Sequence, residues 1–413
     1  MGLFFILNRR TTMDYWIDHL RIETGFTFEE DWVSGVTHDI VAIHIIDGYF
    51  EKILPQDAFE ELDIRPLVSG NNQLLLPNLV DNHIHLDKLK MGEPWTPIKP
   101  AKSIIERFEQ EIPDLENMPS SIQDRANKML EIEKSHGVST IRSHVDVEPM
   151  TGLRHFDAIK DVQQNSTLNI EIVVFPQHGL LRSQSLSLVE SALKKGAEYI
   201  GGVDPYSLDG DYKKSLAETF NLATKYQTGI DIHVHDRHDA GKKTILEIIR
   251  LTQQHKLQGK VYISHAFGLN DFNHNERQDV FAALAHEKIG IVTSVPLDEG
   301  TIPPIMELLD AGVSVSVGND NVYDSWSPYG TGSMQDKLAR LGEMYFINDQ
   351  VHLTSLLSLA TNGRTTLDKK GTLIWPLVGQ QADFMLVKSS SAAEFVARQS
   401  KVISVFNGGN KIK

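Results

Sequence analysis

The segment LLPNLVDNHIHLDK, residues 75–88, combines an apolar strand-like run with two metal-ligating side chains. Its first eight residues, Leu75–Asn82, are mostly apolar and predict a β-strand that continues toward the histidines. His83 and His85 stand two positions apart, so an extended chain directs both imidazoles to one face. Two imidazoles on one face can hold the same metal ion. An isolated His-x-His pair is weak evidence, because most such pairs on strands are structural.

Seven further apolar runs follow this segment, and stretches with helical spacing separate them. The runs predict strands at Ser139–Val145, Ile170–Phe175, Tyr199–Val203, Gly229–His233, Val261–His265, Ile289–Ser294 and Val313–Val317. The helical spacing is clearest at Ser121–Ser135, Leu186–Lys195, Lys213–Tyr226, Lys242–Gln254 and Gln278–His286. Eight strands alternating with helices predict an α/β fold of the (β/α)₈ barrel type, with an open doubly wound sheet as the alternative.

Polar side chains gather at the carboxyl ends of several predicted strands, which favours the barrel over the open sheet. A barrel builds its active site from these ends, whereas an open sheet gathers such residues at one switch point. Six of the 17 histidines stand at such ends, too many for a scatter between surface and core. They are His83, His85, His144, His233, His235 and His265, and Asp146, Asp236 and Asn319–Asn321 accompany them.

The two ends of the chain predict a second, smaller domain. Residues 1–73 and 371–413 contain short β-like pieces, and neither end is long enough for a core of its own. We expect them to combine in a small β-sandwich appended to the barrel of residues 74–370. The connection of residues 86–120 is long for a barrel loop, and it predicts either a lid or substrate wall, or a solvated surface helix.

The composition excludes several classes of function. With 40 Lys and Arg against 55 Asp and Glu, the net charge of −15 argues against nucleic acid or an anionic membrane as partner. The sequence contains no run of about 18 apolar residues, so it predicts no membrane span. The absence of cysteine leaves His and carboxylate as metal ligands. The first ten residues lack the pattern of a signal peptide, so we expect a cytoplasmic protein.

A set of motifs at the strand ends resembles a known family. The set comprises residues 77–88 (PNLVDNHIHLDK), 142–146 (RSHVD), 175–177 (FPQ), 201–205 (GGVDP), 233–236 (HVHD), 264–265 (SH) and 320–326 (DNVYDSW). In combination these motifs resemble the amidohydrolase superfamily, in its cytosine-deaminase-like branch, over residues 40 to 390. They are still more similar to enzymes of the N-isopropylammelide isopropylaminohydrolase type, which remove an alkylamine from an s-triazine ring.

The resemblance implies a mononuclear metal centre. Its ligands would be His83, His85, His233 and Asp320, with His265 beside the metal. Binuclear members usually carry a bridging lysine on the fourth strand, but this chain has none at residues 199–205. We therefore expect one divalent ion per subunit, and imidazole with carboxylate suits zinc, iron and manganese.

The resemblance also implies a reaction. Hydroxide formed on the metal would attack a ring carbon and displace ammonia or an alkylamine. We expect Asp236, His265 and Asp320 to be catalytic, with Asp236 as the base. Cytosine deaminases carry a glutamate at the position of Asp236, and this departure makes cytosine itself a less favoured substrate. The alternatives are a cytosine or pterin deaminase proper, a ring-opening amidase, which the missing bridging lysine disfavours, or a non-catalytic metal-binding relative.

Five residues are expected to bind the small heterocyclic substrate: Lys88, Gln177, His235, Asn321 and Trp326. Each has a simpler interpretation as well. Lys88 can pair with Asp87 or Asp146, and Trp326 can belong to the core. We interpret His144 and Asp146 as supports of the ligands. The resemblance finally suggests a homo-oligomer.

Overall fold

The computed structural model describes residues 13–298 and 300–413, so the predictions for residues 1–12 lie outside the described residues. The chain divides into two compact units. The first comprises the residues up to Asn78 together with 348–355 and 364–413, and the second comprises 79–347 and 356–363. Among the described residues, no helix is long and apolar enough to cross a membrane.

The second unit is the predicted barrel. Each of the eight predicted strands overlaps one strand of a parallel sheet, and sequential strands are neighbours in the order β5 to β12. The strands are β5 (Leu79–Ile84), β6 (Val138–Asp146), β7 (Asn169–Phe175), β8 (Tyr199–Val203), β9 (Gly229–His233), β10 (Val261–Ser264), β11 (Gly290–Thr293) and β12 (Val315–Val317).

The barrel closes where the loop after β12 meets β5. Ile84 and Asp320 form a parallel bridge, and the Asp320 N–H donates to the carbonyl of His83 at 2.6 Å. Gly318 makes this approach possible, because a Cβ there would lie 2.6 Å from both Cβ and N of His83. Closure therefore sets the last strand end directly against the first.

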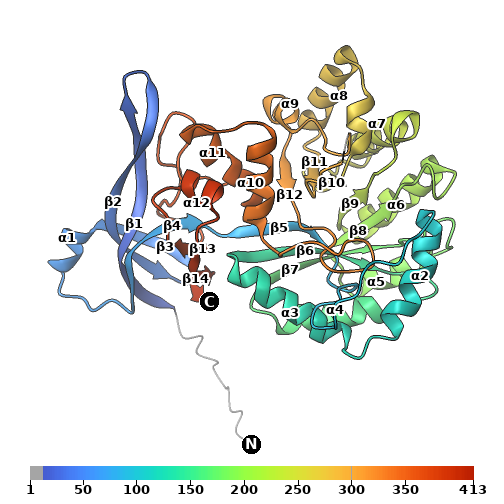
Figure 1. The fold of residues 1–413 in the computed structure, drawn as a ribbon, viewed down its shortest axis with the longest axis horizontal. Helices are drawn as coiled ribbons and strands as arrows, with labels where there is room; N and C mark the ends of the chain where they lie inside the picture. The colour runs from blue at the N-terminus through green and yellow to red at the C-terminus, as the bar shows by residue number, and fades with distance from the viewer. Residues whose placement is uncertain (1–12, 299) are drawn as a thin grey trace, which may run out of the picture. The chain divides into compact units, whose positions relative to one another are not determined.

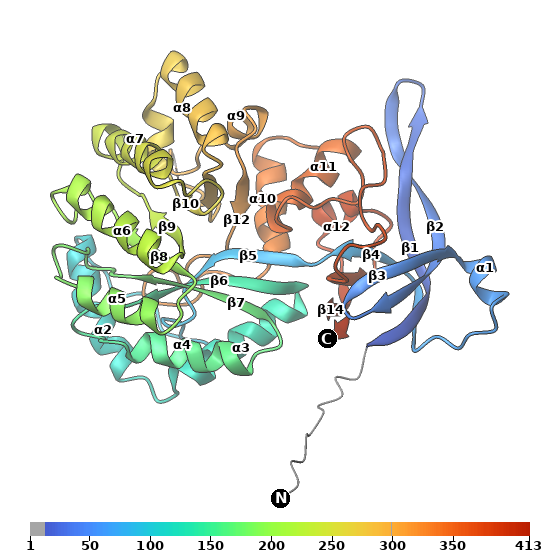
Figure 2. The same ribbon diagram turned by 180° about the vertical axis from the view of Figure 1, so that it is seen from behind.

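Helices surround the parallel strands on the outside of the barrel (Figures 1 and 2). Their starts follow local sequence signals: Ser121 accepts a hydrogen bond from the Asp124 N–H, and Asn273 forms a capping box with Glu276. The helical elements of this unit are α2 (Ile104–Glu116), α3 (Ile122–Ser135), α4 (Arg154–Asn165), α5 (Leu186–Lys194), α6 (Tyr212–Tyr226), α7 (His238–His255), η1 (Phe267–Asp271), α8 (His274–His286), α9 (Ile305–Asp310), α10 (Met334–Met344) and η2 (Leu357–Ala360).

The first unit is built from both chain ends, as the sequence predicts. Its strands form one mixed seven-stranded sheet in the order β15-β14-β13-β4-β1-β2-β3 around an apolar cluster that includes Ile17, Phe50 and Phe384. Its elements are β1 (Asp14–Glu29), β2 (Trp32–Ile46), β3 (Tyr49–Pro55), α1 (Gln56–Glu60), β4 (Val68–Pro77), β13 (Phe384–Val387), α12 (Ala392–Arg398), β14 (Val402–Asn407) and β15 (Asn410–Lys411), and α11 (Gln350–Leu356) lies largely within it.

One predicted strand is divided between the two sheets. Within Leu75–Asn82, residues 75–77 end β4, and β5 begins at Leu79. Pro77 has no N–H for a continuous ladder, and the Asn78 side-chain amide donates to the carbonyl of Phe406 at 2.6 Å. Apolar residues stand on both sides of Pro77 and Asn78, so the sequence was interpreted as one strand.

Candidate metal centre and adjoining pocket

The strand ends of the barrel bring the predicted metal ligands together. His83 lies in β5 and His85 directly follows this strand, His233 ends β9, and Asp320 follows β12. Oδ1 of Asp320 lies 3.5 Å from Nε2 of His83 and 3.5 Å from Nε2 of His85. All three histidines are at most 5% exposed. His83 and His85 thus both approach Asp320, and the ring centroid of His233 lies 4.7 Å from that of His83.

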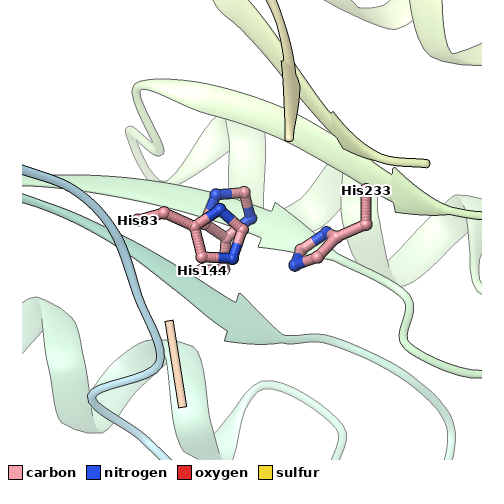
Figure 3. A group of neighbouring side chains, drawn as sticks. All are labelled: His83, His144 and His233. Atoms are coloured by element: carbon pink, nitrogen blue, oxygen red, sulfur yellow. The ribbon is translucent and has the colours of Figure 1, made fainter. Parts of the chain in front are cut away.

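Two further histidines approach these residues. Ligand atoms of His83, His265 and Asp320 lie within 4.8 Å of one another, and so do those of His83, His144 and His233. Figure 3 shows the His83 and His144 rings lying over each other, with the His233 ring facing them; the ring centroids of His83 and His144 are 3.9 Å apart. His144, which the sequence suggested only as a support, therefore reaches ligand distance.

The donor set fits a divalent metal ion. Nε2 atoms of His83, His233 and His265 are buried without a hydrogen-bond partner, an arrangement that is costly unless something occupies the space between them. Burial lowers the pKa of His85, His233 and His265, so these rings are neutral, as metal ligands must be. Although burial would raise the pKa of Asp320, the neighbouring histidines hold it well below its ordinary value.

A hydrogen-bonded chain fixes the tautomer of His83. The Ser264 hydroxyl donates to Oδ1 of Asp231 at 2.7 Å and lies 2.8 Å from Nδ1 of His83. Because the single hydroxyl hydrogen is used on the carboxylate, Nδ1 of His83 must be the donor in the second bond. Nε2 then carries the lone pair and faces Asp320. Arg142 keeps Asp231 charged by donating to Oδ2 at 3.2 Å.

A pocket opens beside this cluster. All five residues predicted to bind substrate line it, and so do the helix residues Ile104 and Phe108. The connection of residues 86–120 thus forms a helix, α2, that supplies one wall of the pocket. The predicted substrate residues in the lining are Lys88, Gln177, His235, Asn321 and Trp326.

His235 and Asp236 are adjacent in the chain, but only His235 lines the pocket. His235 lines the pocket, and Oδ2 of Asp204 lies 2.9 Å from its Nδ1, so that its Nε2 is the free nitrogen. Asp236 is not among the lining residues, and its Oδ2 accepts from the Ser207 N–H at 3.2 Å. The base role of Asp236 stays a prediction. His265, by contrast, lies in the pocket wall beside Asp320.

Two residues of the pocket lining, Lys88 and Gln177, belong to a buried cluster with charged side chains. Nζ of Lys88 donates to Oε1 of Gln177, lies 3.4 Å from Oδ2 of Asp146 and 3.6 Å from Oε2 of Glu111. Asp87 instead accepts from His155, with 2.8 Å between Oδ2 and Nδ1. Of the two pairings considered for Lys88, the structure contains the one with Asp146.

Glu111 is the functional candidate that the sequence analysis missed. It stands on α2 in the apolar stripe of Ile104, Phe108, Ile112 and Leu115, and it is fully buried. An acidic residue in such a stripe is a signal, since an ionised carboxylate is seldom buried without partners. The role of Glu111 becomes visible only when the position of α2 is known. The sequence left open whether residues 86–120 form a substrate wall or a solvated surface helix.

The chain is similar to known proteins along most of its length. Residues 113–408 match the model of the amidohydrolase family. The chain is 35% identical over 412 residues to YahJ of Escherichia coli K12, an uncharacterized protein, covering 97% of this chain and 88% of YahJ. It is 25% identical over 377 residues to N-isopropylammelide isopropyl amidohydrolase of a Pseudomonas species, covering 88% and 91%.

A solved structure extends the similarity to the whole fold. The crystal structure of N-isopropylammelide isopropylaminohydrolase from Burkholderia multivorans matches with a TM-score of 0.82 and 28% identity. The match covers 97% of this chain and 98% of that one. The similarity therefore includes both the barrel and the sheet built from the chain ends.

Proposed function

The chain belongs to the amidohydrolase family, and on this premise we propose that it removes ammonia or an alkylamine from an amino-substituted nitrogen heterocycle of the N-isopropylammelide or cytosine kind. It is a hydrolase that acts on carbon–nitrogen bonds. One observation supports the proposal most strongly. Nε2 of His83, which the bond between Nδ1 and Ser264 leaves without a hydrogen, faces Asp320, and Asp320 lines a pocket together with polar residues and Trp326.

We assign the metal to His83, His85, His233 and Asp320, with His144 and His265 at its edge. Family members generally use a divalent metal, and this set of imidazoles and one carboxylate is compatible with zinc, iron or manganese. When bound, such an ion lowers the pKa of a water molecule towards about 7 and supplies a nucleophile at neutral pH.

The remaining steps fall to the side chains. The water oxygen bonds to the ring carbon, the bond to the exocyclic nitrogen breaks, and the water proton passes to that nitrogen. Because His265 and Asp320 line the pocket and Asp236 does not, we assign this proton transfer to His265 and Asp320. Lys88, Gln177, His235 and Asn321 would hold polar ring substituents, and Trp326 would pack against the planar ring.

A substrate panel tests the proposal. The purified protein would be assayed with N-isopropylammelide, ammelide, cytosine and a pterin, while released isopropylamine and ammonia are quantified and metal content is measured by mass spectrometry. We expect stoichiometric metal and release of amine from at least one compound. Bound metal without turnover would contradict the substrate class, and a protein that binds no metal would contradict the mechanism.

Two alternatives give different results in the same assay. A cytosine or pterin deaminase proper releases ammonia from those rings and no isopropylamine. A non-catalytic relative binds metal and releases neither product. The homo-oligomeric state and the cytoplasmic location expected from the sequence stay predictions.

A further inference from the structure

Glu111 on α2 makes hydrogen bonds to two residues of the pocket wall with its two oxygens. Oε2 accepts from Nε2 of Gln177 at 2.6 Å, and Oε1 accepts from Nε1 of Trp326 at 2.9 Å. Gln177 follows β7, and Trp326 lies in the long segment after β12, so one carboxylate joins two remote segments. Bonds to an ionised acceptor are about twice as strong as neutral ones.

The carboxylate also decides which way the Gln177 amide points. Lys88 donates to Oε1 of this amide, while Glu111 accepts from its Nε2. The flipped amide would set an N–H group against the Lys88 ammonium and a carbonyl oxygen against the Glu111 carboxylate. Both contacts would be repulsive, so a single orientation survives. That orientation leaves Gln177 one N–H and one lone pair.

We propose that Glu111 is a positioning residue that fixes the Gln177 amide and the Trp326 indole in the orientation required for substrate binding. This inference rests on the proposed function, in which these two side chains contact the ring. Lys88 and Glu111, whose Nζ and Oε2 lie 3.6 Å apart, meet the Gln177 amide along one edge. The remaining N–H and the remaining lone pair of the amide would then be left for polar groups of the ring substrate.

Phe108 strengthens the assignment, because it brings a second contact from the same helix. Its ring lies 5.7 Å from Trp326 and 4.5 Å from His178, measured between centroids, and it is 2% exposed. The indole is therefore held at its N–H by Glu111 and on its ring by Phe108. Both contacts come from α2, so the geometry of the pocket depends on this helix.

The substitution Glu111→Gln tests the role with little change of shape. Its amide has a single acceptor oxygen, so its NH₂ group must face a donor, either Nε2 of Gln177 or Nε1 of Trp326. With the best substrate from the panel, we expect KM to rise about tenfold or more, because bonds to a charged group are lost. We expect kcat and metal content to change much less. Glu109→Gln, the same change at an exposed position of α2, should leave KM unaltered.

Glu111→Asp separates positioning from charge balance. Aspartate keeps the negative charge near Lys88 but withdraws both oxygens by one methylene. If Glu111 only neutralised Lys88, this variant would behave like the wild type, and the proposal would be wrong. We expect it instead to raise KM as Glu111→Gln does. A cycle with Gln177→Ala adds a second criterion: the effects on KM should be non-additive, and additivity would refute action through Gln177.

A spectroscopic readout needs no substrate and therefore survives failure of the proposed function. With ¹⁵N-labelled indoles, five side-chain resonances are expected from the five tryptophans, and Trp326→Phe identifies the one from Trp326. Loss of the bond to Glu111 should move that resonance upfield in Glu111→Gln and leave it in place in Glu109→Gln. An unmoved resonance in a folded Glu111→Gln protein would overturn the positioning role. If Glu111→Gln does not fold, the same measurement on Glu111→Asp decides.

Discussion

The Ser264 hydroxyl lies 2.8 Å from Nδ1 of His83 and leaves the opposite nitrogen of that ring bare. Ser264→Ala removes the acceptor that holds Nδ1 protonated, so the ring can rotate or change tautomer. Loss of such a supporting bond typically lowers metal affinity by about 10–100-fold, and we expect this range here. Chelator competition measures it. Ser139→Ala removes another buried hydroxyl, at the other end of the parallel strands, and should leave the affinity unchanged.

Two substitutions test which residue transfers the proton, His265 or Asp236. His265→Asn should lower kcat by about 10²–10⁴-fold, the usual contribution of a positioned acid or base. Asp236→Asn should keep most of the activity, because its carboxylate is engaged by the Ser207 N–H and lies outside the pocket lining. Steady-state kinetics at equal metal content decides between them. If Asp236→Asn proves inactive while binding metal, the original prediction of Asp236 as base is restored.

The sequence predicted the strands because each buried strand is a short apolar run between turn-forming residues. It also predicted which face His83 and His85 share, since alternation on a strand is local. What it did not predict depends on packing between distant segments. The approach of His144 to His83 follows from the stagger of β5 and β6. The partners of Glu111 follow from the docking of α2, and no local pattern specifies either.

The same limit applies to the position of the Asp236 side chain. The sequence places it one residue after His235, but only one of two adjacent side chains at a strand end can enter the barrel. Asp204, at the end of β8, binds both backbone N–H groups and Nδ1 of His235, and it holds this turn so that the imidazole enters. The orientation of the His235 imidazole thus depends on Asp204, a residue about 30 positions away in the sequence.

The close approach of Gly318 to His83 predicts that a larger side chain at this position lowers both the free energy of unfolding and the metal affinity. In Gly318→Ala the new Cβ would lie 2.6 Å from two atoms of His83, so the backbone of β5 or of the closing loop must move. Overpacking of this kind costs about 1–3 kcal/mol in free energy of unfolding. Urea unfolding and metal titration should both detect it. At Gly202 an added Cβ meets nothing closer than 4.0 Å, so Gly202→Ala should unfold like the wild type.

Glu23 gives the seven-stranded unit a pH dependence whose sign can be worked out. Its Oε1 accepts from the Ala392 N–H at 2.8 Å, and its Oε2 accepts from the hydroxyl of Thr366. Burial raises its pKa; the two hydrogen bonds and the charge of Arg21 oppose this, but the pKa stays above its ordinary value. The folded state then binds more protons than the unfolded state between the two pKa values. Stability is therefore highest below about pH 4.3 and falls as the pH rises toward the raised pKa.

Glu23→Gln should remove this loss of stability. Its amide oxygen can accept from Ala392, its NH₂ can donate to the Thr366 hydroxyl, and no charge is buried at neutral pH. We expect the variant to gain stability over the wild type at pH 8 and to lose that advantage near pH 4, measured by urea unfolding across this range. In Glu51→Gln, at an exposed position of the same sheet, the free energy of unfolding should change with pH as it does in the wild type. A constant offset between Glu23→Gln and wild type at all pH values would mean that Glu23 does not titrate on folding.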